Sequence, residues 1–198
     1  MRTEGFSVDG FNLAFAIKSC IRLSILQDGK LVYCLAIKSG LDRDPYLVPA
    51  LIDVYSDLGS LKDAHKLFEE IPEWNTGIWG SMMKDYLKSL EQTKVFELFS
   101  KMRTDGFELE PFTSECLVRA CGNVSAGKEG KSVHGFCIKH NFMNSNYIYL
   151  QTLLVDMYLN CGLLDFGLRL FKEVSNKDVV LWTAIVLEAG FSFFALTD

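Results

Sequence analysis

The sequence predicts an all-α protein, built as an α-solenoid of stacked helix–turn–helix repeats. Three observations support this class: the chain repeats itself, its apolar residues follow a helical period, and glycine or proline separates the helical stretches. One helical hairpin cannot cover its own apolar face, so successive hairpins must stack, which leaves a concave inner surface. No segment shows a convincing period-two alternation, and a β-sheet is therefore not expected.

The internal repeat is about a hundred residues long. MRTEGF at 1–6 returns as MRTDGF at 102–107, and QDGKLVYCLAIK at 27–38 returns as KEGKSVHGFCIK at 128–139, both at an offset of 101. Farther along, YLVPALIDVYSDLGSL at 46–61 matches YLQTLLVDMYLNCGLL at 149–164 at an offset of 103. Nearly the whole chain is thus two copies of one unit, which makes a repeat architecture the first hypothesis.

Within each copy the helices are predicted in pairs. We expect them near residues 12–23 and 27–39, on either side of Gly59 within 45–75, at 77–88 and 92–103, at 113–122 and 126–140, and at 148–160 and 164–174. Gly40, Gly106, Pro111 and Gly162 separate the pairs or close their turns, as residues that end helices do.

These helices divide the chain into hairpins of alternating length. The predicted segments are the end of a preceding repeat at 1–9, a long-type repeat at 10–44, a short-type repeat at 45–75, a standard repeat at 76–110, a long-type repeat at 111–145, a short-type repeat at 146–178 and a truncated repeat with a divergent tail at 179–198.

The composition excludes several classes of protein. With 49% hydrophobic residues and only 4 Pro, the chain can bury enough surface to fold, so it is not disordered. The net charge of −5 excludes a basic surface over the whole chain, though not a local basic strip. Six scattered cysteines without a disulfide framework spacing favour a reducing compartment.

Neither end of the chain has the character of a targeting peptide or of a membrane span. The opening MRTEGFSVDG has no transit peptide character. The apolar stretch Val179–Leu196 approaches a membrane-spanning length, but Glu188 interrupts it, and its equivalent at Trp79 leads into a charged helix. We therefore expect no membrane association.

Two motifs resemble chemical sites and are interpreted otherwise. GNVSAGKE (122–129) and SAGKEGKS (125–132) approach a phosphate-binding loop, but the segment before them is predicted to be helical rather than a strand. Cys116, Cys121, His134 and Cys137 have a loose zinc spacing, yet the first copy has Phe15, Cys20, Tyr33 and Ala36 there. We expect no metal, no cofactor, no small-molecule substrate and no catalytic set, so the chain is not predicted to be an enzyme.

Aromatic residues recur at equivalent places in the hairpins. These residues are Tyr46, Tyr55, Trp79, Tyr149, Tyr158 and Trp182. Because they lie in phase with the apolar stripe, we expect them to pack between hairpins rather than to stack on bases.

The repeats resemble a known family. ALIDVYSDLGSLKDAHKLFEEIPE, IWGSMMKDY, VFELFSKMRTDGFELE, CLVRACGNVSAGKEGKSVHGFCIKHNF and TLLVDMYLNCGLLDFGLRLFKEVSNKDVVLWTAIV are similar to motifs of plant pentatricopeptide-repeat proteins of the PLS subclass. The tetratricopeptide repeat fits less well, because it lacks the alternation of lengths and the IW or LW helix start. The resemblance implies a right-handed superhelix and a fragment without a catalytic C-terminal domain.

The resemblance further implies binding of single-stranded RNA in mitochondria, or alternatively chloroplasts, with about one base per repeat. In that family the first helix of each hairpin lines the groove, and the fifth and last residues of a repeat contact the base. The corresponding pairs are Ala14 with Asp44, Pro49 with Asn75, Gly80 with Glu110, Glu115 with Ser145, and Thr152 with Asp178; Thr183 opens a sixth repeat. Ala14, Pro49 and Gly80 have no hydrogen-bonding side chain, whereas Thr152 with Asp178 matches a guanine-associated pair.

Contacts to the RNA backbone are expected from basic residues of the more basic hairpins. Residues 10–44 and 111–145 each carry a net charge of +2, while residues 45–75 carry −4. The candidates are Lys18, Arg22, Arg119, Lys128, Lys131 and Lys139. Because affinity for RNA depends strongly on phosphate neutralisation, we expect weak, salt-sensitive binding.

The sequence therefore indicates a protein that positions organellar RNA for editing, splicing or stabilisation, with RNA-editing or processing factors as further partners. The alternatives are a protein-interaction scaffold that recruits a partner through the acidic 45–75 hairpin, or a truncated product without function.

Overall fold

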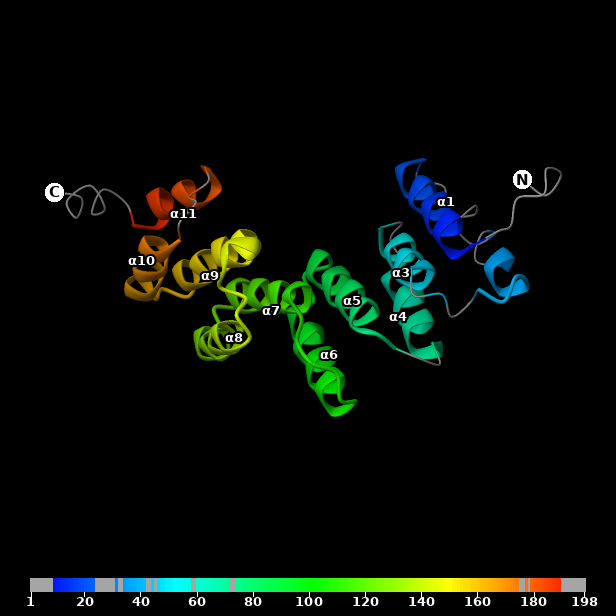
Figure 1. Cartoon of the computed structure of the whole chain (residues 1–198), viewed down its shortest axis with the longest axis horizontal. Coiled ribbons are helices and arrows are strands. Elements are labelled where there is room, and N and C mark those ends of the chain that lie inside the picture. Colours follow the sequence, from blue (N-terminus) through cyan, green and yellow to red (C-terminus); the bar gives the residue numbers. More distant parts are fainter. Residues whose placement is uncertain are drawn as a thin grey trace. The chain divides into compact units, whose positions relative to one another are not determined.

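The computed structural model describes residues 9–23, 31, 34–41, 44, 46–57, 60–71, 74–174, 177 and 179–189. In this part of the chain helices follow one another and no strand occurs (Figure 1). They are α1 (Gly10–Leu23), α3 (Leu47–Asp57), α4 (Leu61–Glu70), α5 (Thr76–Lys88), α6 (Gln92–Thr104), α7 (Pro111–Asn123), α8 (Gly127–Lys139), the 3-10 turn η1 (Ser145–Tyr147), α9 (Ile148–Asn160), α10 (Leu164–Glu173) and α11 (Val179–Ala189). The all-α prediction is confirmed.

The bounds of α5 to α10 differ from the predicted helices by at most two residues. Of the helix predicted at 27–39, residues 31 and 34–38 are helical and residue 39 lies in a turn, while residues 27–30, 32 and 33, like Gly59, lie outside the described residues. We call α1, α3, α5, α7, α9 and α11 first helices, because each opens a predicted hairpin, and α4, α6, α8 and α10 second helices.

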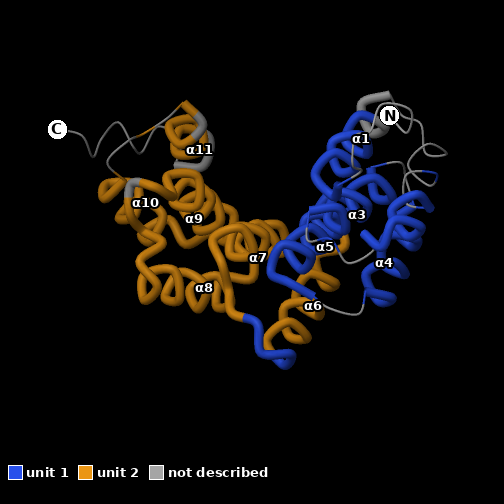
Figure 2. Tube along the Cα trace, turned by 45° about the vertical axis from the view of Figure 1, so that its right-hand side comes forward, with its two compact units in different colours: residues 1–90, 104–107 blue, residues 91–103, 108–198 orange. Residues whose placement is uncertain are grey.

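The chain divides into two compact units (Figure 2). Unit 1 comprises Met1–Leu90 and Thr104–Phe107, and unit 2 comprises Glu91–Arg103 and Glu108–Asp198. Unit 1 therefore holds α1, α3, α4 and α5, whereas unit 2 holds most of α6 and all of α7 to α11.

In unit 1 the first helices pack side by side. Helix α1 contacts α3, α3 contacts α5, and α4 contacts both α3 and α5. The fully buried ring of Trp79 lies 4.9 Å from the ring of Phe68 in an edge-to-face arrangement, and 5.5 Å from the ring of Trp74. This aromatic cluster holds α4 against α5, because such ring pairs add to the stabilisation gained by burial alone.

Unit 2 repeats the arrangement. Helix α7 contacts α9, α9 contacts α11, and both α8 and α10 contact α9. Gly130 leaves room for Met157 between α8 and α9, because a Cβ there would lie 2.4 Å from Met157 Sδ and the methionine side chain would have to move. A Cβ on Gly122 would lie 3.4 Å from Met157 Cα, an ordinary van der Waals contact between α7 and α9.

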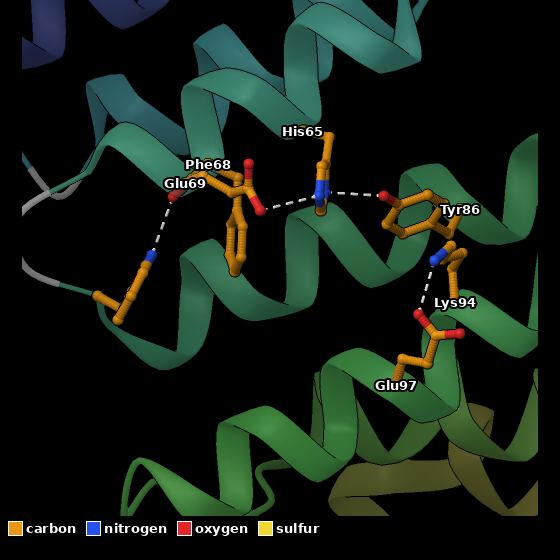
Figure 3. A network of polar contacts seen from close by, with 7 residues as sticks. His65, Phe68, Glu69, Tyr86, Lys94 and Glu97 are labelled. Carbon is orange, nitrogen blue, oxygen red and sulfur yellow. Dashed lines mark hydrogen bonds and ion pairs between the residues drawn. The ribbon is translucent and has the colours of Figure 1, made fainter.

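The same polar contact joins successive hairpins in each unit. In unit 1, His65 Nδ1 of α4 lies 2.8 Å from Tyr86 Oη of α5, and His65 Nε2 lies 3.3 Å from Glu69 Oε1 (Figure 3). In unit 2, His134 Nδ1 of α8 lies 2.8 Å from Tyr158 Oη of α9. A second helix is thus tied by hydrogen bond to the first helix that follows it.

Two of the aromatic residues predicted to pack between hairpins are exposed instead, Tyr46 at 67% and Tyr149 at 52%. Trp79 and Tyr158 are buried as expected, and the ring of Trp182 lies 4.9 Å from that of Phe171 in the preceding hairpin, in an edge-to-face arrangement. Tyr46 and Tyr149 stand at the start of a first helix, and the helical period cannot distinguish an exposed place there from the core.

The segments with accidental motifs have structural roles. The GKE and GKS sequences lie where α7 ends and α8 begins, so a helix precedes them. Cys116, Cys121 and Cys137 are buried, and burial raises the pKa of Cys121 to about 12 and of Cys137 to about 11. These thiols pack as small apolar side chains. Among the helices described, none combines the length and apolar character needed to cross a membrane.

Candidate nucleic-acid interface

Each first helix from α1 to α9 carries three residues at a spacing of four, beginning at a predicted base-contacting residue. The five sets are Ala14, Lys18 and Arg22; Pro49, Asp53 and Asp57; Gly80, Lys84 and Lys88; Glu115, Arg119 and Asn123; and Thr152, Asp156 and Asn160. Residues four apart lie on one face of a helix. We call this face the groove stripe, and it is the surface on which the sequence analysis expects RNA.

In unit 1 the groove stripes of α3 and α5 are joined by two ion pairs. Lys84 Nζ lies 2.5 Å from Asp53 Oδ1, and Lys88 Nζ lies 2.5 Å from Asp57 Oδ1. We call these contacts the α3–α5 charge pairs. The side chains of Asp53 and Asp57 are about a quarter exposed, at 20% and 27%, so water screens the pairs only in part.

A third carboxyl group, that of Asp85, lies beside these pairs and is fully buried. Lys88 Nζ lies 3.8 Å from Asp85 Oδ1, and neither carboxyl oxygen has a hydrogen-bond partner. Burial, and secondarily the negative charge of Asp53, raise the pKa of Asp85 to about 7, against the opposing effect of Lys84 and Lys88. Partial burial lowers the pKa of Lys88, but the hydrogen bond and charge of Asp57 outweigh this, so the pKa is raised.

The groove stripe of unit 2 is arranged differently. The guanidinium group of Arg119 donates to the hydroxyl group of Tyr149 and lies 5.5 Å from the centre of its ring. Glu115, one turn before Arg119, is half-buried, and burial raises its pKa although Arg119 opposes the shift. Within the described residues Arg119 forms no ion pair, and its charge faces solvent beside an exposed aromatic ring.

The predicted base-contacting residues of the first helices differ in accessibility. Pro49 is half-buried and Gly80 is buried. Thr152 is nearly buried and donates its hydroxyl hydrogen to Ile148 O at 3.1 Å. Thr183 is exposed and makes the equivalent bond to Val179 O at 2.7 Å.

The predicted last residues of the repeats stand at the starts of first helices. Asp44 Oδ1 accepts the N–H groups of Tyr46 and Leu47 at 2.9 and 3.0 Å. Asn75 Oδ1 accepts the N–H group of Ile78 at 2.9 Å.

Glu110 occupies the same place at the start of α7, where it forms a capping box with Thr113. These side chains therefore satisfy backbone donors that a helix leaves unpaired. Asp178 lies outside the described residues.

The basic candidates are divided between the two helix types. Lys18 is exposed on α1 and Arg119 on α7, both on groove stripes, and the side chain of Arg22 lies outside what is described. Lys128, Lys131 and Lys139 belong to α8, a second helix. Lys131 Nζ lies 4.1 Å from the ring centre of Phe166 in α10, so it bridges two second helices.

Four residues of this surface were not predicted from the sequence: Asp53, Asp57, Lys84 and Lys88. The spacing of four from Pro49 and Gly80 was a sufficient signal to place them on the groove stripe, but their pairing depends on how α3 packs against α5.

Unit 2 also contains a mainly apolar hollow of about 670 Å³ between α6, α7 and α8, lined by Phe96, Phe99 and Phe136 among others. It lies between the second helices α6 and α8 and the first helix α7, and no groove-stripe residue lines it.

The fold and this stripe define a class: a helical-repeat protein whose first helices each carry a polar stripe at the same spacing. A family model described as "PPR repeat" matches residues 50–76. The chain belongs to the pentatricopeptide-repeat family, as many similar proteins also indicate.

Two relatives come from Arabidopsis thaliana. The chain is 46% identical over 192 residues, covering 97% of this chain and 34% of the relative, to pentatricopeptide repeat-containing protein At1g06140, mitochondrial. It is 36% identical over 188 residues, covering 94% of this chain and 18% of the relative, to pentatricopeptide repeat-containing protein At3g09040, mitochondrial. The chain spans about a third or less of the relatives it matches.

A solved structure shares the fold. It is the pentatricopeptide repeat protein PPR10 in complex with an 18-nucleotide psaJ RNA element, with a TM-score of 0.66 and 16% identity over 94% of this chain and 33% of that one. The helical-repeat solenoid predicted from the sequence is therefore confirmed as the fold.

Proposed function

We propose that this chain binds single-stranded RNA along the groove stripes of its first helices. The carrying observation is the recurrence of one polar stripe, at a fixed spacing, on five consecutive first helices. Such a stripe offers one set of side chains per hairpin to an unstacked strand, the arrangement on which one-base-per-repeat recognition depends. The RNA-bound state of PPR10 supports the proposal by fold alone.

In this proposal the repeats at 10–44, 45–75, 76–110, 111–145 and 146–178 each face one base. Thr152 with Asp178 is the pair best suited to guanine, and Asn75 and Glu110 contribute to neighbouring positions. Lys18, Arg22 and Arg119 neutralise phosphates from the groove stripe, while Lys128, Lys131 and Lys139 act only if the strand also crosses the second helices. The role is to position a transcript for editing, splicing or stabilisation rather than to catalyse a reaction.

The mitochondrial names of two relatives support a mitochondrial site of action, with the chloroplast as the alternative. The chain aligns with only part of longer relatives. Its binding to an organellar transcript, and the binding of processing factors to the same RNA, are therefore both part of this proposal.

A gel shift with pooled mitochondrial RNA over a series of salt concentrations tests RNA binding. We expect a shift at low salt that weakens as salt rises, because phosphate contacts release counterions. Double-stranded RNA of the same length is the control and is expected not to bind, since its bases are stacked and paired. Absence of a shift at low salt would contradict the proposal.

The second candidate function is a protein-interaction scaffold. The net charge of −4 on residues 45–75 favours it, because this hairpin repels RNA and suits a basic partner. Pull-down from mitochondrial extract treated with ribonuclease distinguishes the two functions: a partner retained without RNA, together with no gel shift, favours the scaffold.

A further inference from the structure

The α3–α5 charge pairs lie where RNA phosphates would pass. Asp53 and Asp57 follow Pro49 by one and two turns on α3, and Lys84 and Lys88 follow Gly80 in the same way on α5. In both helices these residues therefore share the face of a predicted base-contacting position. The two lysines are the basic residues of this face on α5.

The lysines of this junction are already neutralised. Each Nζ lies 2.5 Å from a carboxylate oxygen of the neighbouring helix, in a direct charge-assisted hydrogen bond. The exposed pair between Lys66 and Glu70 on the second helix α4 is looser, with 3.9 Å between Nζ and Oε1. A phosphate that approached Lys84 or Lys88 would have to displace a partly shielded aspartate and would also meet its negative charge.

One first helix of unit 2 lacks this neutralisation. Arg119 occupies the place on α7 that Lys84 occupies on α5, but its guanidinium group donates to the neutral hydroxyl group of Tyr149. A phosphate there meets a positive charge without a competing carboxylate at hydrogen-bond distance. Carboxylates thus neutralise the lysines on the groove stripe of α5, but none among the described residues does so for Arg119 on that of α7.

We propose that Lys84 and Lys88 form a latent phosphate-binding site, which Asp53 and Asp57 keep closed. The strand then crosses the junction between α3 and α5 without a backbone contact, and phosphate binding is confined to steps such as Arg119. The inference rests on the proposed RNA binding. It adds which first helices contact the RNA backbone and which do not.

The first variant opens the site: Asp53→Asn with Asp57→Asn, in the full chain. Fluorescence anisotropy with a single-stranded RNA selected from the pool measures affinity against salt. We expect tighter binding and a salt dependence of log K steeper by about 1.4, that is about 0.7 for each released lysine. The gain over the unmodified chain should therefore shrink about sevenfold when salt is raised fourfold.

A matched control separates this site from a general change of charge. Glu70→Gln with Glu97→Gln removes two carboxylates that pair with Lys66 and Lys94 on second helices, and so changes the net charge equally. We expect no steeper salt dependence from the control. An equal gain in both variants would overturn the proposal, as would no gain in the first.

A further variant tests whether the lysines already contact RNA. Circular dichroism checks that each variant is still folded. Replacing both pairs by neutral amides, with Asp53→Asn, Asp57→Asn, Lys84→Gln and Lys88→Gln together, is expected to leave affinity and salt dependence as in the unmodified chain. Weaker binding would mean that the lysines already contact RNA, which overturns the proposal. If the unmodified chain itself binds no RNA at low salt, the proposed function fails, and this inference fails with it.

Discussion

The imidazole of His65 and the hydroxyl group of Tyr86 meet across consecutive hairpins, with 2.8 Å between Nδ1 and Oη. His134 and Tyr158 meet at the same distance in the other unit. Tyr86 and Tyr158 are buried, so the bond to the histidine helps to satisfy each hydroxyl group away from water. The recurrence indicates that this bond fixes how one hairpin stacks on the next.

Replacing Tyr86 by Phe removes this bond from unit 1. We expect the free energy of unfolding to fall by about 1 kcal/mol, the usual net contribution of one intramolecular hydrogen bond. Urea unfolding followed by circular dichroism measures the change. Tyr46→Phe is the control, because Tyr46 is exposed, and its effect should stay within about 0.5 kcal/mol. Equal effects of the two variants would contradict a role for the bond.

The burial of His134 makes stability depend on pH. Burial lowers the pKa of His134 below its ordinary value of 6.5, although Glu173 opposes the shift. The unfolded chain therefore binds a proton more readily, and the stability that His134 contributes is lost as pH falls below 6.5. We expect His134→Gln to flatten the decline in unfolding free energy on the acid side. A decline of unchanged slope would show that other groups cause it.

Asp85 gives the opposite pH dependence. Its pKa of about 7 in the folded chain exceeds the ordinary 3.8, so the folded state holds the proton more tightly. The unfolding free energy attributable to Asp85 therefore falls as pH rises from about 4 to about 7. Asp85→Asn should stabilise the chain above pH 7 by about 4 kcal/mol, at about 1.4 kcal/mol per unit of pKa, and have little effect near pH 4. Thermal melts at both pH values measure this, and equal effects would refute it.

Asn75 is expected to stabilise α5 through its cap on Ile78. Asn75→Ala should lower the free energy of unfolding by about 1 kcal/mol, whereas Asn75→Asp preserves the acceptor and should cost little. Urea unfolding of both variants provides the measurement. If Asn75→Asp is as destabilising as Asn75→Ala, the cap is not what this side chain contributes.

Arg119 and Lys131 test which helices contact RNA. Arg119→Gln removes a charge from the groove stripe and should reduce the salt slope of RNA binding by about 0.7. Lys131→Gln removes a charge from α8, where Lys131 packs on Phe166, and should leave the slope unchanged. Anisotropy at several salt concentrations compares them. Equal losses would mean that RNA also crosses the second helices.

The helical pattern predicted the helices closely because turn residues separate them, as at Gly106 and Gly162, both of which have a positive φ. The repeat of motifs likewise predicted which residues are equivalent. The exposure of Tyr46 and Tyr149 could not be predicted in this way, since an aromatic residue at the start of a helix fits the apolar pattern whether or not a neighbour covers it.

The sequence by itself determined the helices, the repeat and the family, because these follow from local period and from motifs at fixed spacing. Only the tertiary structure decided which charges cancel: the packing of α3 on α5 brings Asp53 to Lys84 and Asp57 to Lys88, residues that are 31 positions apart. Electrostatic energy depends on distance and on shielding from water, and neither is written in the order of residues along a chain.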